Sequence, residues 1–365
     1  MKIDFANLSK SYIENKNQID LAIKSVLDTS SFIMGEQVFE FERNLVDFTK
    51  AKFAITCSNG TDALLLAMMA IGIGPGDEVI TSPFTFISTA ETIAFLGATP
   101  VFVDIDEKTY NIDYSKIEEK ITKKTKAIIP VSLFGQMSNM NHINLIAEKH
   151  KLFVIEDAAQ SFGAEYNQIK SCNSSVLATT SFFPAKPLGC FGDGGAVFTS
   201  NNDLAEKIKS LRLHGQSKKY FHKYIGMGGR LDTLQAAILN VKLKTYENDI
   251  KRRSQVANFY NELLGERIDS VPYISEECKS VWAQYSIRLK NRKKVQEVLR
   301  NKGIPTAIYY PQPLHLQECF KYLGYNKGDF SVCEKISNEI ISLPMNPYLT
   351  FDEQKYITSQ LIKLI

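Results

Sequence analysis

Lys186 is the residue of this sequence whose setting most favours covalent chemistry. It lies between Pro184 and Pro187, and the apolar pair Phe182-Phe183 precedes it. Prolines remove backbone donors and stiffen the chain, and an apolar approach favours burial. Burial disfavours the ammonium form, so the pKa of such a lysine falls and its amine can attack a carbonyl or form a Schiff base. A lysine whose stem packs on the phenylalanines while its head reaches water is an equally open interpretation.

A second candidate, Asp157, follows an apolar run from Leu152 to Ile155 that we expect to be a strand. In open α/β sheets, ligands bind beyond the carboxyl ends of the strands. A carboxylate there suits pyridoxal phosphate (PLP), because the ring nitrogen of this cofactor needs an anionic partner to stay protonated and act as an electron sink. Capping of the following turn is the alternative role for Asp157.

A third segment contains Gly60 and Thr61 and lies between an expected strand and an apolar helix. Glycine, hydroxyl and backbone N–H groups at the start of a helix form an anion site, and a cofactor phosphate is its natural occupant. Simple capping of the helix by Asn59 or Thr61 is the alternative. The three segments together supply a phosphate cradle, a partner for the ring nitrogen and a Schiff-base lysine, and this combination favours a PLP enzyme.

With these three segments, the sequence resembles the DegT-type sugar aminotransferases, which are PLP enzymes of fold type I. The likeness runs over essentially the whole chain. The further matching motifs are Gly74-Pro-Gly-Asp-Glu-Val79, Pro83-Phe-Thr-Phe86-Ile-Ser-Thr89, Gly97-Ala-Thr-Pro-Val101, Arg230-Leu-Asp-Thr-Leu-Gln-Ala-Ala237 and Gly303-Ile-Pro-Thr306.

The resemblance implies a role for each matching residue. Lys186 forms the Schiff base with PLP, Asp157 pairs with the pyridine nitrogen, and Gln160 lies against the phenolic oxygen of the ring. Phe86 stacks on the ring face, although without the resemblance it would be interpreted as ordinary core. The residues that hold the phosphate are Gly60, Thr61 and Ser181.

Two positions depart from the family pattern. Family members commonly carry an Asn that reaches from the neighbouring subunit to the cofactor phosphate or the substrate, and this chain has Gly228 there. We keep Gly228 as a cofactor-binding position, with backbone N–H groups or Arg230 supplying the contact. The second departure is Tyr309-Tyr310, where close relatives often carry His-Tyr. The expected substrate residues are Arg230, Tyr309, Tyr310 and His214.

Composition favours an enzyme rather than a nucleic-acid or membrane protein. The net charge of +3 over 365 residues is too small for a nucleic-acid footprint, and no apolar span suits a membrane or a signal peptide. Six cysteines without metal spacing predict free buried thiols in the cytoplasm and no metal site. One basic cluster is either a solvated face or a docking patch for a diphosphate: His214, Lys218, Lys219, His222 and Lys223.

Strand-like and helical runs alternate, which predicts an α/β fold with a mostly parallel seven-stranded sheet flanked by helices. A long charged helix over about residues 231–258 is expected to lead into a smaller C-terminal α+β domain. We place the large PLP-binding domain at residues 1–250 and the small domain at residues 251–365. The expected strands are Phe53 to Cys57, Glu78 to Thr81, Val101 to Val103, Ala127 to Val131, Leu152 to Ile155, Thr179 to Phe183 and Ala196 to Thr199.

The sequence therefore predicts a homodimeric PLP-dependent aminotransferase with shared active sites. It would move an amino group from L-glutamate to the ketone of a nucleotide-linked sugar, for surface polysaccharide or glycan biosynthesis. The segments 170–176 and 180–190 resemble enzymes that act at C3, such as those using UDP-2-acetamido-3-oxo-glucuronate, and Arg230 or the basic cluster would meet a uronate carboxylate. The alternatives are a dTDP-3-oxo-hexose or UDP-4-oxo-6-deoxyhexose substrate, or a regulatory protein that holds PLP without turnover.

Overall fold

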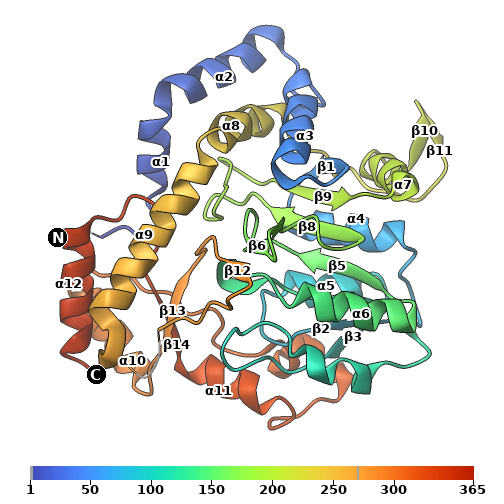
Figure 1. Cartoon of the computed structure of the whole chain (residues 1–365). Coiled ribbons are helices and arrows are strands. Elements are labelled where there is room, and N and C mark those ends of the chain that lie inside the picture. The colour runs from blue at the N-terminus through green and yellow to red at the C-terminus, as the bar shows by residue number, and fades with distance from the viewer. Residues whose placement is uncertain (1–2, 269–270) are drawn as a thin grey trace.

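A seven-stranded sheet forms the centre of the computed structural model, which describes residues 3–268 and 271–365 (Figure 1). The strand order is β1-β9-β8-β5-β4-β2-β3, and only β9 runs against the direction of the other six strands. The prediction of a mostly parallel α/β sheet is confirmed. Its strands are β1 (Phe53–Cys57), β2 (Glu78–Thr81), β3 (Thr99–Phe102), β4 (Thr125–Ile129), β5 (Phe153–Asp157), β8 (Leu177–Ser181) and β9 (Gly195–Thr199).

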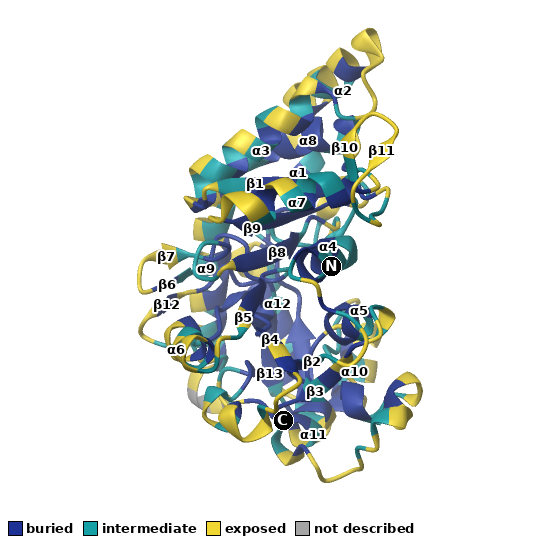
Figure 2. Cartoon of the chain, turned by 90° about the vertical axis from the view of Figure 1, so that its right-hand side faces the viewer, coloured by how far each residue is buried: buried dark blue, intermediate teal, exposed yellow. Residues whose placement is uncertain are grey.

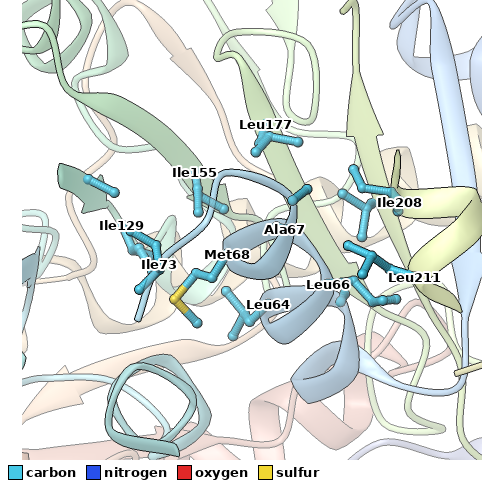
Figure 3. Close-up of a cluster of buried hydrophobic side chains, with 14 of the residues drawn as sticks. Leu64, Leu66, Ala67, Met68, Ile73, Ile129, Ile155, Leu177, Ile208 and Leu211 are labelled. Carbon is cyan, nitrogen blue, oxygen red and sulfur yellow. The ribbon is translucent and has the colours of Figure 1, made fainter. Parts of the chain in front are cut away.

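Helices cover both faces of this sheet, which explains why its strands are nearly continuous apolar runs. On one face, α4 (Gly60–Ala70) and α7 (Asn202–Arg212) pack beside each other against the sheet, and Leu64 and Met68 of α4 share one apolar cluster with strand residues such as Ile155 (Figure 3). On the other face, α3 (Glu36–Thr49) and α6 (Met140–His150) bury their own apolar sides. The packing on both faces leaves the strand ends as the places where polar side chains gather.

The single long helix that we predicted over residues 231–258 is wrong. The chain forms α8 (Thr233–Leu243) and then α9 (Tyr246–Leu264), with a turn at Thr245 between them. Tyr246 is 1% exposed, and its hydroxyl donates a hydrogen bond to the Phe162 carbonyl over 2.6 Å. The change of helix direction is therefore associated with the burial of the Tyr246 ring. The sequence gives no local sign of the turn, because it contains no proline or glycine there.

The C-terminal part has its own small sheet, in which β13 (Tyr285–Arg288) pairs antiparallel with β14 (Ile340–Leu343). A separate hydrophobic cluster joins this sheet to helices α9, α10 and α12, and it also includes Ile3 from the start of the chain. This cluster supports a small domain, and we keep the division at residue 250 as a proposal. The helices of this part are α10 (Arg292–Asn301), α11 (Ser331–Glu339) and α12 (Phe351–Ile362).

Helix α2 (Lys16–Thr29) extends away from the body of the fold, with most of its surface exposed (Figure 2). Leu21 is 67% exposed, and Ile33 beyond the helix is 57% exposed. None of the helices in the described ranges has both the length and the apolar character needed to cross a membrane. The remaining helices and strands are α1 (Leu8–Glu14), α5 (Ser88–Phe95), β6 (Glu165–Tyr166), β7 (Ile169–Lys170), β10 (Gln216–Lys218), β11 (Phe221–His222) and β12 (Cys278–Lys279).

Candidate active site

Three of the predicted site residues lie at one edge of the sheet. Asp157 is the last residue of β5, Ser181 is the last residue of β8, and Gly60 begins the helix that follows β1. These strands run in the same direction, so their carboxyl ends meet at the same edge. The predicted positions are therefore neighbours in space, although they are far apart in the sequence.

Asp157 is a buried carboxyl group with two hydrogen bonds from protein donors. It is 5% exposed; its Oδ2 accepts from the Thr89 hydroxyl over 2.8 Å and its Oδ1 from the Ala159 amide over 3.2 Å. Burial raises the pKa of Asp157, while the hydrogen bonds and the charge of Lys186 act in the opposite direction. Asp157 thus caps the turn that follows β5 through the Ala159 amide, and its carboxylate can still face a cationic partner.

Lys186 lies on the loop after β8, and its amine shares this low-dielectric space with Asp157. The residue as a whole is half-buried, but its amine is desolvated, and burial lowers the pKa of Lys186 while the Asp157 carboxylate raises it. The structure therefore favours the interpretation in which the amine of Lys186 is buried over the one in which its head reaches water. Within the described residues, no side-chain hydrogen bond holds this amine. A desolvated amine of lowered pKa is the form that reacts with a carbonyl.

The start of α4 approaches the end of β8 too closely for a side chain at residue 60. A Cβ built on Gly60 would lie 2.7 Å from the Cβ of Ser181, so only glycine allows this contact. The Thr61 and Ser88 hydroxyls are 3.0 Å apart, and the Asn59 side chain accepts from the Asp62 amide over 2.8 Å. Asn59 thus caps the helix, while Gly60, Thr61 and Ser181 converge as a phosphate cradle requires.

Gln160 and Tyr310 form a hydrogen-bonded pair across the site. The amide nitrogen of Gln160 donates to the Tyr310 hydroxyl over 3.1 Å, and its Oε1 accepts from the Phe134 amide over 3.0 Å. Burial raises the pKa of both Tyr309 and Tyr310, so both hydroxyls stay protonated at neutral pH. The prediction that the Tyr309-Tyr310 segment lies at the site therefore has a direct contact behind it, through Tyr310.

Phe86 is 55% exposed, which excludes the interpretation as ordinary core. Its ring lies 6.5 Å from that of Tyr310, between centroids, at an interplanar angle of 40°. An aromatic ring left open beside buried polar groups can cover the face of a flat heteroaromatic ring. The desolvated amine, the buried carboxylate, the cradle at Gly60 and this open ring fit PLP.

His214, Gly228 and Arg230 form a second group. A Cβ built on Gly228 would lie 3.1 Å from His214 Nε2 and 3.5 Å from Arg230 Nη2, so the two side chains converge over the glycine. Within the described residues, no hydrogen bond or ion pair joins this group to Lys186 or Asp157. The basic cluster continues along the exposed hairpin of β10 and β11.

Ser88 and Thr89, for which the sequence indicated no role, connect the predicted residues to one another. Both lie in or beside the start of α5, two and three positions after Phe86, so one turn supplies an aromatic ring, a partner of Thr61 and a partner of Asp157. Their motif was one of the segments that carried the resemblance, yet nothing local indicated what the two hydroxyls contact.

We expect Thr89→Val to lower turnover about tenfold, because it removes a hydrogen bond to a buried carboxylate while keeping the side-chain shape. Steady-state kinetics and a thermal melt measure the effect. Thr92→Val is the matched control, since the Thr92 hydroxyl donates only to backbone carbonyls of its own helix. Equal turnover in the two variants would show that Thr89 does not support Asp157.

A parallel α/β sheet that gathers these groups at the carboxyl ends of its strands is the arrangement of a PLP-dependent enzyme of fold type I. The comparisons with known proteins agree. The family model described as the DegT/DnrJ/EryC1/StrS aminotransferase family matches residues 14–362. The chain belongs to this family.

The relatives and solved structures match nearly the whole chain. UDP-2-acetamido-2-deoxy-3-oxo-D-glucuronate aminotransferase of Pseudomonas aeruginosa is 48% identical over 98% of this chain and 99% of its own length. The pleiotropic regulatory protein of Geobacillus stearothermophilus is 44% identical, over 99% of this chain and 98% of its own. S. venezuelae DesV, solved with a ketimine intermediate, is 34% identical with a TM-score of 0.97, covering 100% of this chain and 98% of that one.

A further solved structure carries a cofactor. NtdA from Bacillus subtilis, with bound cofactor PMP, is 32% identical with a TM-score of 0.92 and covers 100% of this chain and 85% of that one. The protein described here is accordingly a sugar aminotransferase that uses PLP.

Proposed function

We propose that this enzyme transfers an amino group from L-glutamate to the C3 ketone of a UDP-linked sugar, in surface polysaccharide or glycan biosynthesis. The observation that carries the proposal is a desolvated Lys186 amine within the electrostatic influence of the buried Asp157 carboxylate, in a chain 48% identical to a 3-oxo-sugar aminotransferase. Its place in the cytoplasm stays a prediction.

In this proposal each residue keeps a defined task. PLP supplies the electron sink when bound, Asp157 provides the anion against its ring nitrogen, and Phe86 covers its ring face. Lys186 would hold the cofactor covalently, and its amine would serve as the base that moves the substrate proton. Gln160, held by its hydrogen bond to Tyr310, would orient the PLP ring. The cradle of Gly60, Thr61 and Ser181 holds the phosphate.

The experiment that tests the substrate is a panel of amino sugars run in the reverse direction with 2-oxoglutarate. Glutamate formation is measured for UDP- and dTDP-linked sugars with the amine at C3 or C4, with and without a C6 carboxylate. We expect the UDP-linked 3-amino sugars to react fastest. A preference for a dTDP-linked 3-amino or a UDP-linked 4-amino-6-deoxy sugar would favour one of the alternative substrates instead.

A regulatory role is the second candidate, because a relative of 44% identity is described as a pleiotropic regulatory protein. A protein that only holds PLP would keep the residues of the cradle. Addition of L-glutamate separates the two cases: in an aminotransferase it bleaches the visible absorption of the cofactor, whereas in a protein without turnover it leaves this band unchanged.

We further propose a homodimer whose two active sites each use residues of both subunits. On the Lys186 loop, Phe183 and Phe191 are 52% and 40% exposed, and a second copy of the chain would cover this open aromatic surface. The group of His214, Gly228 and Arg230 would then reach the cofactor phosphate or the substrate of the neighbouring subunit.

Mixing two inactive variants tests the shared sites. If Lys186 and Arg230 of one site come from different subunits, a mixed dimer of Lys186→Ala and Arg230→Ala contains one intact site. Because half of the dimers are mixed and each has one good site, we expect about a quarter of the wild-type activity to return after subunit exchange. Sites built within one subunit would show no recovery, and sedimentation of an active monomer would contradict the dimer itself.

A further inference from the structure

The loop that carries Lys186 is closed on itself by backbone hydrogen bonds. The Cys190 amide donates to the Phe182 carbonyl over 2.8 Å, and the Phe182 amide donates to Gly194 over 2.7 Å. Inside the loop, the Lys186 amide donates to the Phe183 carbonyl over 2.8 Å. The position of the reactive amine therefore depends on how this loop is held against the rest of the protein.

Helix α8 contacts the backbone of this loop through two side chains. Lys242, which is 8% exposed, donates from its Nζ to the Gly189 carbonyl, and Gln235 Oε1 accepts from the Phe191 amide over 2.8 Å. Residue 189 has no room for a side chain, since a Cβ there would lie 2.4 Å from the Pro184 carbonyl oxygen. The buried Lys242 thus contacts Gly189, three residues after the reactive Lys186.

A lysine is a costly choice for this buried position, where an apolar side chain of similar length would pack without a desolvation penalty. Its ammonium group lies 5.5 Å from the centroid of the Phe191 ring, and within the described residues its one hydrogen-bond acceptor is Gly189. Burial of this ammonium group costs desolvation energy, and the group makes one directed hydrogen bond, to the loop that carries Lys186. This combination indicates a positioning role for Lys242.

We propose that Lys242 is a positioning residue for Lys186: by holding the Gly189 carbonyl, it keeps the loop in the geometry that presents the Lys186 amine to PLP. The proposal rests on the proposed role of Lys186. Within the described residues Lys242 touches neither Asp157 nor the phosphate cradle, so it acts through the loop that carries Lys186.

The test compares Lys242→Met with Lys244→Met, a control two residues along the chain at an exposed position. Hydrogen exchange of the peptide over residues 182–195 is measured in the full chain without PLP, and the dissociation constant of PLP is measured by absorption. Loss of a charge-assisted hydrogen bond predicts about tenfold faster exchange at the Lys186 and Cys190 amides and about tenfold weaker PLP binding in Lys242→Met. If Lys242→Met showed the same amide exchange rates and the same PLP dissociation constant as Lys244→Met, the proposal would be overturned.

A pH series on the wild-type protein keeps the proposal testable if Lys242→Met does not fold. Burial lowers the pKa of Lys242 to about 8. The groups that face it are Cys190, Asp249 and Arg253, and the pKa of the Cys190 thiol is raised to about 11. The ammonium form is thus lost as the pH rises through about 8, and protection of the Lys186 and Cys190 amides, corrected for intrinsic exchange, should fall about threefold by pH 9.5.

Unchanged protection across this range would contradict a charged clamp. The outcome is also separate from that of the proposed function. Lys186→Ala tests whether this lysine holds the cofactor at all, whereas Lys242→Met leaves Lys186 in place and changes only how firmly its loop is held.

Discussion

Lys186→Ala should give a protein that shows no cofactor band in the visible range and has no detectable transamination. The substitution removes both the amine that binds PLP covalently and the base that moves the substrate proton. General acid–base catalysis alone typically contributes ~10²–10⁴-fold, so we expect turnover to fall by about 10⁴-fold or more. Absorption spectra after incubation with PLP, and glutamate-dependent turnover, measure the two losses separately.

Lys149→Ala is the control for this experiment, because Lys149 is an exposed residue of α6 that pairs with Glu118 on the surface. It should keep both the visible band and the wild-type rate. Retention of near wild-type turnover by Lys186→Ala would move the reactive amine to another residue, and the buried Lys242 would be the next one to examine.

Asp157→Asn is the second large effect that we expect: PLP binding persists, while turnover falls steeply. The amide keeps the size of the side chain and can still accept from Thr89, which donates over 2.8 Å to the native carboxylate. It carries no charge, so it cannot hold the ring nitrogen in its protonated form. A charge-assisted contact is worth ~1.5–3 kcal/mol in binding, and loss of the electron sink adds to this in the rate.

The measurements are the dissociation constant of PLP and kcat for the same preparations. Asp113→Asn is the matched carboxylate control, because Asp113 caps a short helix and pairs with Lys116 of that helix. An unchanged kcat in Asp157→Asn would exclude its role as the partner of the ring nitrogen, whatever happens to PLP affinity.

Sequence alone determined the parts of this protein that depend on neighbours along the chain. Apolar runs bounded by turn residues marked the strands, since a parallel sheet covered on both faces needs continuous apolar segments. Gly60, Asp157 and Lys186 each lie at the end of such a run or within five residues of it, so their places near strand ends followed from local order. Their joint chemistry could be inferred because the strands of one sheet end at the same edge.

Tertiary structure decided the contacts between distant residues, because packing rather than local preference selects them. Thr89 reaches Asp157 across 68 positions, and Gln160 reaches Tyr310 across 150. The turn between α8 and α9 also depends on a distant contact, because Tyr246, which follows the turn, is buried with its hydroxyl bonded to the Phe162 carbonyl. Lys242 lies 53 positions from Gly189 and is an ordinary helix residue in the sequence. The Lys242 amine meets the Gly189 carbonyl only because α8 packs against the loop. A buried polar group has few partners other than those that the fold provides.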